Sequence, residues 1–180
     1  DWTPSEVQSA IQMTATPAIN KPFAWSDPAP ASYHDAGTGI INVANAVRAG
    51  LVLNESAENF RYANPQNGGL TSLLNLPYLS DFRCKNTCTF IRTFRATRSG
   101  TWSTSAVSGE HSVKLETYPE MFTVSAGEMQ TIMVKVSILD SQTNMGNSEQ
   151  EVHASVHLTP SDSSTPSLKL PVMVKLDAGD

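Results

Sequence analysis

A strict alternation of apolar and polar residues near the end of the chain constrains its fold more than any other feature. Between Leu168 and Leu176 every even position is a branched aliphatic residue, whereas the odd positions are lysine, proline or methionine. Successive side chains of a β-strand point to opposite faces of a sheet, so this pattern predicts a strand with one buried face. Pro171 cannot donate a backbone hydrogen bond, which favours an edge strand.

The same period of two recurs through much of residues 70–180 and predicts a sheet protein. Further strands are predicted at residues 73–79, 89–97, 102–107, 113–115, 122–124, 132–138 and 152–158. Together with the last strand they make about seven or eight short strands separated by turns, which is typical of an antiparallel β-sandwich. We therefore expect a mainly β fold in which residues 70–180 form the sandwich.

A helix is predicted at the start of the chain. Thr3 can cap it, Pro4 suits the first helical position, and Glu6 completes a capping box. Its apolar residues recur at spacings of three and four and form one stripe: Val7, Ala10, Ile11 and Ala15. Because this stripe needs a partner, we expect it either to dock on the sandwich or to form a homodimer.

The region between the helix and the sandwich contains several turn signals. Prolines in residues 21–33 predict a surface loop, and Gly37 and Gly39 predict a tight turn. A short helix is expected at residues 42–49, ended by Gly50. Residues 54–69 are rich in asparagine and glycine and are interpreted as a linker.

Two motifs in this region resemble the subtilisin-like serine peptidases, or subtilases. Residues 2–15 read Trp-Thr-Pro-x-x-Val-x-Ser-Ala-Ile-x-x-Thr-Ala, similar to the helix that follows the nucleophile segment of that family. Residues 35–52 begin Asp-x-Gly-x-Gly and end Gly-Leu-Val, similar to the end of the catalytic domain in larger members. Two matches in the family's order are more specific than one short motif.

The resemblance extends to the sandwich, which resembles the fibronectin type III-like domain that follows many subtilase catalytic domains. It lies in residues 91–97, Leu158-Thr159 and Leu170-Pro171-Val172. It implies three parts: the end of the catalytic domain at residues 1–53, the linker at 54–69, and the fibronectin type III-like domain at 70–180.

The resemblance also implies a role. The parent would be a secreted endopeptidase that hydrolyses amide bonds, and its partners would be its protein substrates. Its catalytic Asp, His and Ser would all precede Asp1, so we expect this fragment to be inactive alone. The fragment would support or cover the catalytic domain of the same polypeptide, position substrate or aid export. The alternative is an independent secreted binding or adhesion module.

Composition agrees with an exported protein and excludes some partners. Charged residues make up 16% of the chain and the net charge is −5, against about 25% charged residues in typical soluble domains. Because basic residues do not cluster, we expect no nucleic-acid partner. No apolar run approaches the roughly 20 residues of a membrane helix, so we expect no membrane span.

The two cysteines, Cys84 and Cys88, are predicted to form a disulfide that closes a tight turn, with the chain in an extracellular location. Two cysteines without matching partners do not predict a zinc site.

His153 and His157 would lie about 13 Å apart on one face of a strand, too far to share a metal, and are interpreted as part of a solvated face. His34 and Asp35 do not predict a catalytic triad, because adjacent residues seldom orient each other and no serine of the chain lies in a nucleophile motif such as Gly-x-Ser-x-Gly. We therefore expect no catalytic residue, metal or cofactor in this chain.

Overall fold

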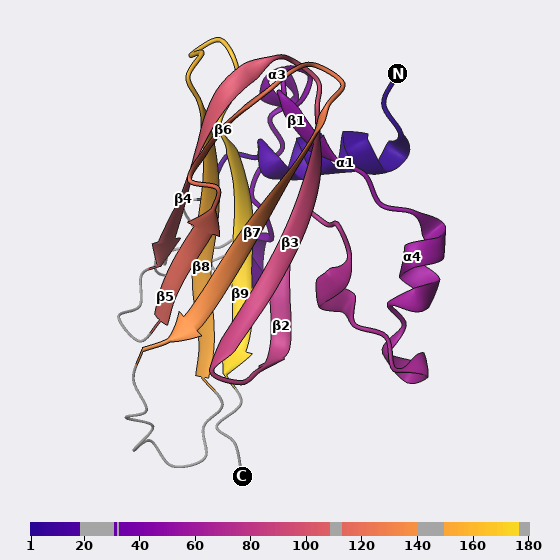
Figure 1. Cartoon of the computed structure of the whole chain (residues 1–180), viewed down its shortest axis with the longest axis vertical. Coiled ribbons are helices and arrows are strands. Elements are labelled where there is room, and N and C mark those ends of the chain that lie inside the picture. The colour runs from indigo at the N-terminus through magenta and orange to yellow at the C-terminus, as the bar shows by residue number, and fades with distance from the viewer. Residues whose placement is uncertain (19–30, 32, 109–112, 140–149, 177–180) are drawn as a thin grey trace, which may run out of the picture.

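Two packed β-sheets form the body of the molecule, and short helices lie along one side of it (Figure 1). The computed structural model describes residues 1–18, 31, 33–108, 113–139 and 150–176. The four-stranded sheet has the order β1 (Leu51–Leu53), β3 (Thr87–Ala96), β7 (Met129–Ile138) and β5 (Val113–Tyr118). The five-stranded sheet has the order β2 (Leu79–Cys84), β9 (Leu168–Leu176), β8 (Gln150–Pro160), β4 (Gly100–Ser108) and β6 (Met121–Val124).

Alternating residues of both sheets fill the core between them. In β9 the even positions from Leu168 to Val174 are fully buried, as the alternation predicts. They lie beside the buried positions of β8, with Val152 opposite Val174. Phe90 and Phe94 of β3 reach the same core from the other sheet. The prediction of a mainly β sandwich is therefore confirmed.

One strand pair departs from the predicted antiparallel arrangement. Among the described residues, β2 runs parallel to β9, whereas the other paired strands are antiparallel. Its register begins at Leu79 opposite Val172, one residue after Pro171. The edge prediction for Pro171 therefore holds only for the first half of β9, because β2 covers the strand from Val172 onward.

A strand expected at residues 73–79 begins only at Leu79, so that prediction is wrong for most of its length. The segment carries the short helix η2 (Thr71–Leu73) and then an irregular stretch. The guanidinium of Arg92, a buried residue of β3, donates hydrogen bonds to the carbonyls of Ser72, Leu76 and Tyr78. These carbonyls accept hydrogen bonds from a side chain, in the place of a neighbouring strand.

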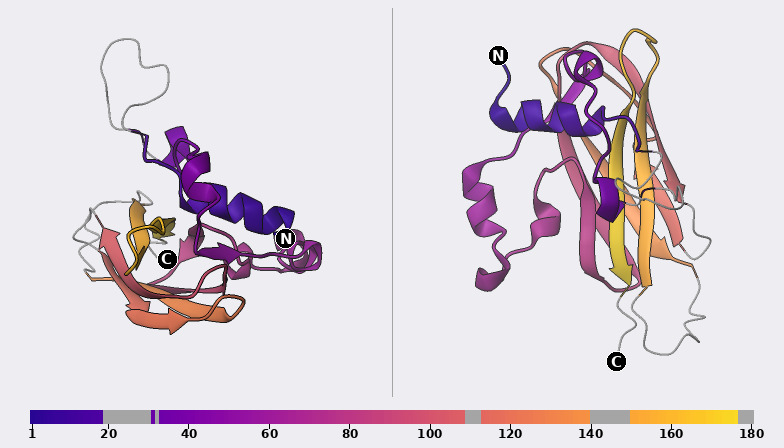
Figure 2. Two further views of the ribbon diagram at one scale, coloured as in Figure 1. Left: turned by 90° about the horizontal axis from the view of Figure 1, so that it is seen from above. Right: turned by 180° about the vertical axis from the view of Figure 1, so that it is seen from behind.

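In the described part of the chain four α-helices flank the sheets (Figure 2): α1 (Pro4–Met13), α2 (Tyr33–Ala36), α3 (Val43–Ala46) and α4 (Ala57–Tyr62). The capping box of α1 is present as predicted, with Glu6 N donating to Thr3 Oγ1 and Thr3 N donating to Glu6 Oε2. The predicted linker contains α4 and the short helix η1 (Pro65–Asn67), which lie beside the body in Figure 1.

Strand β1 connects the N-terminal segment to the sandwich. Leu51 lies opposite Ala96 and Leu53 opposite Phe94, and all three β1 residues have 0% exposure. The core of the sandwich therefore includes residues on the N-terminal side of position 54.

Candidate functional site

Helix α1 packs against the sandwich through a face that contains two polar residues. Glu6, Ser9, Ala10 and Met13 are its buried residues, at the i, i+3, i+4, i+7 spacing of one helix face. Ser9 Oγ accepts a hydrogen bond of 2.9 Å from the backbone nitrogen of Leu53 at the end of β1. The helix is thus bound to the sheet edge by specific hydrogen bonds as well as by apolar contact.

Glu6 also forms an ion pair with the sandwich. Arg95 Nε of β3 donates to Glu6 Oε1 at 2.6 Å, and the Glu6 side chain is only 4% exposed. The hydrogen bond from Arg95 is the main reason that the pKa of Glu6 lies below its ordinary value, with a smaller lowering from the backbone of Thr3. The same hydrogen bond raises the pKa of Arg95. Both groups are therefore charged at neutral pH.

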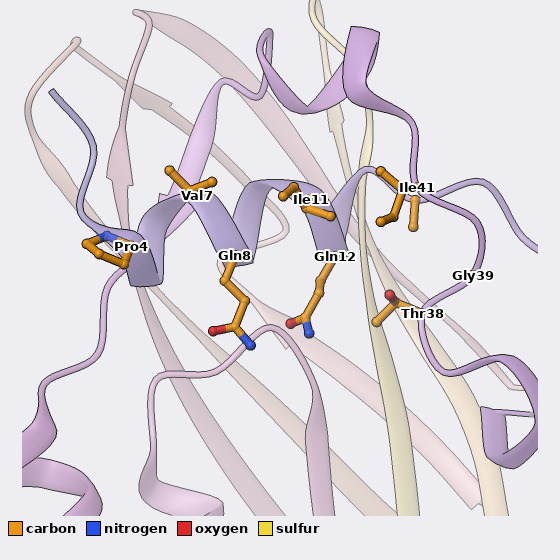
Figure 3. Close-up of a pocket in the computed structure, with 9 residues that line it drawn as sticks. Pro4, Val7, Gln8, Ile11, Gln12, Thr38, Gly39 and Ile41 are labelled. Carbon is orange, nitrogen blue, oxygen red and sulfur yellow. The ribbon is translucent and has the colours of Figure 1, made fainter.

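The opposite side of α1 belongs to an apolar surface, here called the α1 surface. Its exposed aliphatic side chains are Val7 of α1 at 43%, Ile40 and Ile41 of the loop after α2 at 63%, Val43 of α3 at 66% and Val47, the C-cap of α3, at 65%. A hollow of about 430 Å³ lies in this surface between α1 and the loop at residues 38–41. Figure 3 shows the side chains that line it. Ile11 and Ile41 line it, together with Gln8 and Gln12.

A pair of backbone hydrogen bonds fixes that loop beside the end of α1. Thr16 N donates to Ile40 O at 2.9 Å and Ile40 N donates to Thr16 O at 2.8 Å. Gly39 has a φ of +120°, and a Cβ at this position would lie 2.3 Å from Thr16 O. Only glycine permits both this conformation and this close approach, so the predicted glycine turn has a specific structural role.

The prediction that α1 needs a partner surface is only partly answered by this packing. Ala10 of the predicted stripe is covered by the sandwich, but Val7 is exposed and Ile11 and Ala15 line the hollow. The helix docks on the sandwich mainly through Glu6, Ser9 and Met13, which lie outside the stripe. Most of the stripe thus remains on the α1 surface.

The disulfide between Cys84 and Cys88 is confirmed, with a Cα–Cα distance of 5.6 Å. It joins the end of β2 to the start of β3 and closes a turn in which Asn86 has a φ of 56°. Asparagine tolerates this left-handed conformation better than most residues. The bond therefore links the two sheets at a tight turn.

The predicted solvated face of β8 is partly covered, so that interpretation is wrong near His153. Helix α2 lies over this face, and the ring of Tyr33 stacks on His153 with the two centroids 5.7 Å apart. Ser155 is buried and hydrogen-bonds to His157, whose pKa is lowered by burial and by the nearby charge of Lys169.

Helix α2 also brings His34 close to Glu151 and His153. The metal-ligating atoms of all three residues lie within 4.8 Å of one another. His34 and Glu151 are 117 residues apart in the sequence, so no local motif could have indicated this cluster. His157 is not part of it.

None of the helices among the described residues has the length and apolar character needed to cross a membrane. No protein-family model matches the chain, and no curated protein matches it.

Solved structures with a similar β fold are distant in sequence. A FixG-related protein from Vibrio parahaemolyticus has a TM-score of 0.38 and 11% identity, covering 51% of this chain and 79% of its own. The secreted serine protease VesC from Vibrio cholerae has a TM-score of 0.37 and 9% identity, covering 55% of this chain and 22% of its own. A PapD-like domain of human CEP192 has a TM-score of 0.38 and 9% identity, covering 58% and 83%. Likeness at this level does not define a function for the chain.

Proposed function

We propose that this chain is the non-catalytic C-terminal part of a secreted, extracellular subtilisin-like serine endopeptidase. In this proposal the sandwich is a fibronectin type III-like domain and the α1 surface contacts the catalytic domain of the same polypeptide. The observation that carries the proposal is where the exposed aliphatic residues lie. The α1 surface is formed by residues of 4–15 and 38–47, which lie within the two segments that resemble the end of a subtilase catalytic domain.

The two faces of α1 support a position of this helix between the sandwich and the catalytic domain. Its polar face is already fixed to the sandwich by Glu6 and Ser9, while Val7 remains in solvent. Removing apolar surface from water contributes about 25 cal/mol per Å², so an exposed group of aliphatic side chains favours association. A domain placed against Val7, Ile41 and Val43 would be held at a fixed orientation to the sandwich by the Glu6–Arg95 pair.

The parent would hydrolyse amide bonds. A serine activated by histidine attacks the scissile carbonyl, and hydrogen-bond donors stabilise the resulting oxyanion. The catalytic Asp, His and Ser would all lie in the polypeptide that precedes Asp1. The role of this chain is then to support the catalytic domain and to cover part of its surface.

The first test is the coding sequence directly upstream of Asp1. A Gly-Thr-Ser nucleophile segment shortly before Asp1 would support the proposal. A signal peptide or an unrelated domain at that place would contradict it and would favour the independent secreted binding module.

A pair of matched variants in the longer polypeptide tests the contact itself. Ile41 on the α1 surface and Ile91 on β3 have similar exposures of 63% and 57%. Ile41→Glu should release the catalytic domain, which would be seen as a lower melting temperature of that domain and faster proteolytic separation, whereas Ile91→Glu should have little effect. Equal behaviour of the two variants would refute the contact. Light scattering on this chain alone would show whether the same surface forms a homodimer.

A further inference from the structure

A second site lies where helix α2 crosses strand β8. Glu151 Oε1 is 2.5 Å from His34 Nε2 and 2.9 Å from His153 Nε2. The two imidazole rings meet edge to face with centroids 5.5 Å apart, and Tyr33 stacks on His153. Two imidazole nitrogens and a carboxylate oxygen therefore converge from two elements that are remote in the sequence.

These three groups are a suitable set of ligands for a divalent transition metal. Imidazole nitrogen and carboxylate oxygen both bind Zn²⁺, at about 2.0–2.2 Å, and two histidines with one glutamate form a known zinc ligand set. Tetrahedral coordination places neighbouring ligand atoms about 3.3 Å apart, so the two contacts of Glu151 would need to widen by less than about 1 Å. The ligand atoms of the two histidines, which lie within 4.8 Å of one another, would need to take up the same spacing. The side chains can make this adjustment, because His34 is 56% exposed and Glu151 and His153 are 31% and 30% exposed.

The surroundings favour an ordered site with an open position. The ring of Tyr33 restricts His153 through parallel stacking at an interplanar angle of 4°. Lys169 Nζ lies 5.2 Å from the centroid of the Tyr33 ring, in a cation–π contact. Three protein ligands leave the fourth position of a tetrahedral metal for water.

We propose that His34, Glu151 and His153 form a binding site for one Zn²⁺-like divalent metal ion. The metal would fasten α2 to β8 and so hold the chain just before the turn at Gly37 against the sandwich. This proposal does not depend on the proteolytic role of the parent, because its ligands all belong to the described part of this chain.

Zinc titration of the 180-residue chain without an affinity tag tests this site. Isothermal titration calorimetry with ZnCl₂ should show one ion per chain. His34→Ala and Glu151→Gln should each weaken binding by at least about tenfold. The matched control is His157→Ala, which removes a histidine of the same strand and should leave the affinity unchanged. Circular dichroism of each variant establishes that the fold is retained.

Hydrogen exchange supplies a readout specific to the position of the metal. Zn²⁺ should slow exchange of the backbone amides of α2 in the wild-type chain but not in His34→Ala. Absence of saturable binding, or equal losses in His34→Ala and His157→Ala, would overturn the proposal. Binding that survives in Glu151→Gln and His34→Ala would overturn it as well.

Discussion

Glu6 of helix α1 and Arg95 of strand β3 form a 2.6 Å hydrogen-bonded ion pair across 89 residues of sequence. Glu6 is at the same time the acidic member of the capping box, in which Thr3 N donates to its other oxygen. One carboxylate thus caps the N-terminus of the helix and fixes the helix to the sandwich. Because its side chain is almost fully enclosed, its removal should affect both functions.

Glu6→Gln should lower the free energy of unfolding at neutral pH by about 1–3 kcal/mol, the cost of leaving a buried partner poorly satisfied. The pKa of Glu6 is lowered below 4.5 in the folded chain. Its stabilising effect is therefore complete above the unfolded pKa and is lost as the pH falls through the folded pKa. Urea unfolding across this range should show a steeper loss of stability in the wild type than in Glu6→Gln.

The exposed pair of Lys114 and Glu116 provides the control. Solvent screens such pairs, so Glu116→Gln should leave the stability at neutral pH nearly unchanged. If Glu6→Gln proved equally harmless, the ion pair would not be what fixes α1 to β3.

Most of the strands could be predicted because alternation is a local property of the sequence. Residues 132–138, 152–158 and 168–176 carry their own evidence for one buried face. The parallel pairing of β2 with β9 could not be predicted, since it depends on which strands meet after folding. The same holds for β1, whose three residues are too few to show a period and are placed by their pairing with β3.

The candidate sites were less predictable from the sequence. The apolar stripe of α1 indicated a face in need of a partner, but Glu6 and Ser9, which are polar, are buried against the sandwich. Their burial depends on Arg95 and Leu53, which no local pattern connects to the helix. His34 and Glu151 likewise come together only through the packing of α2 on β8.

Gly50 should not tolerate alanine, although its φ is not unusual. A Cβ at this position would lie 2.6 Å from the Trp102 ring and 2.9 Å from Thr165 Cγ2. Trp102 is buried, so Gly50→Ala should cost about 1–3 kcal/mol through overpacking. Gly100→Ala is the matched control, because its Cβ would be 3.7 Å from the same indole. Comparable melting temperatures for the two variants would contradict this account.

Arg92 should be essential for the segment that precedes β2. Burial lowers its pKa to about 10, yet it stays charged at neutral pH and donates to the carbonyls of Ser72, Leu76, Tyr78 and Ile91. Arg92→Met would leave these carbonyls without their donor and should cost about 3 kcal/mol or more. Hydrogen exchange should rise first in residues 72–78. Arg48→Met, at an exposed arginine, should change neither quantity, and a similar response from both variants would argue against the role of Arg92.

Reduction of the Cys84–Cys88 disulfide should weaken the sandwich without unfolding it. The bond closes a ring across a sequence separation of only 4, for which the loop-entropy model gives about 2 kcal/mol. Both cysteines are buried, so the turn should remain packed after reduction. Urea unfolding with and without a reductant should show this difference in the wild type and none in a Cys84→Ala/Cys88→Ala double variant. A loss of cooperative unfolding on reduction would instead mean that the bond, and not the packing of β2 and β3, holds the two sheets together at this end.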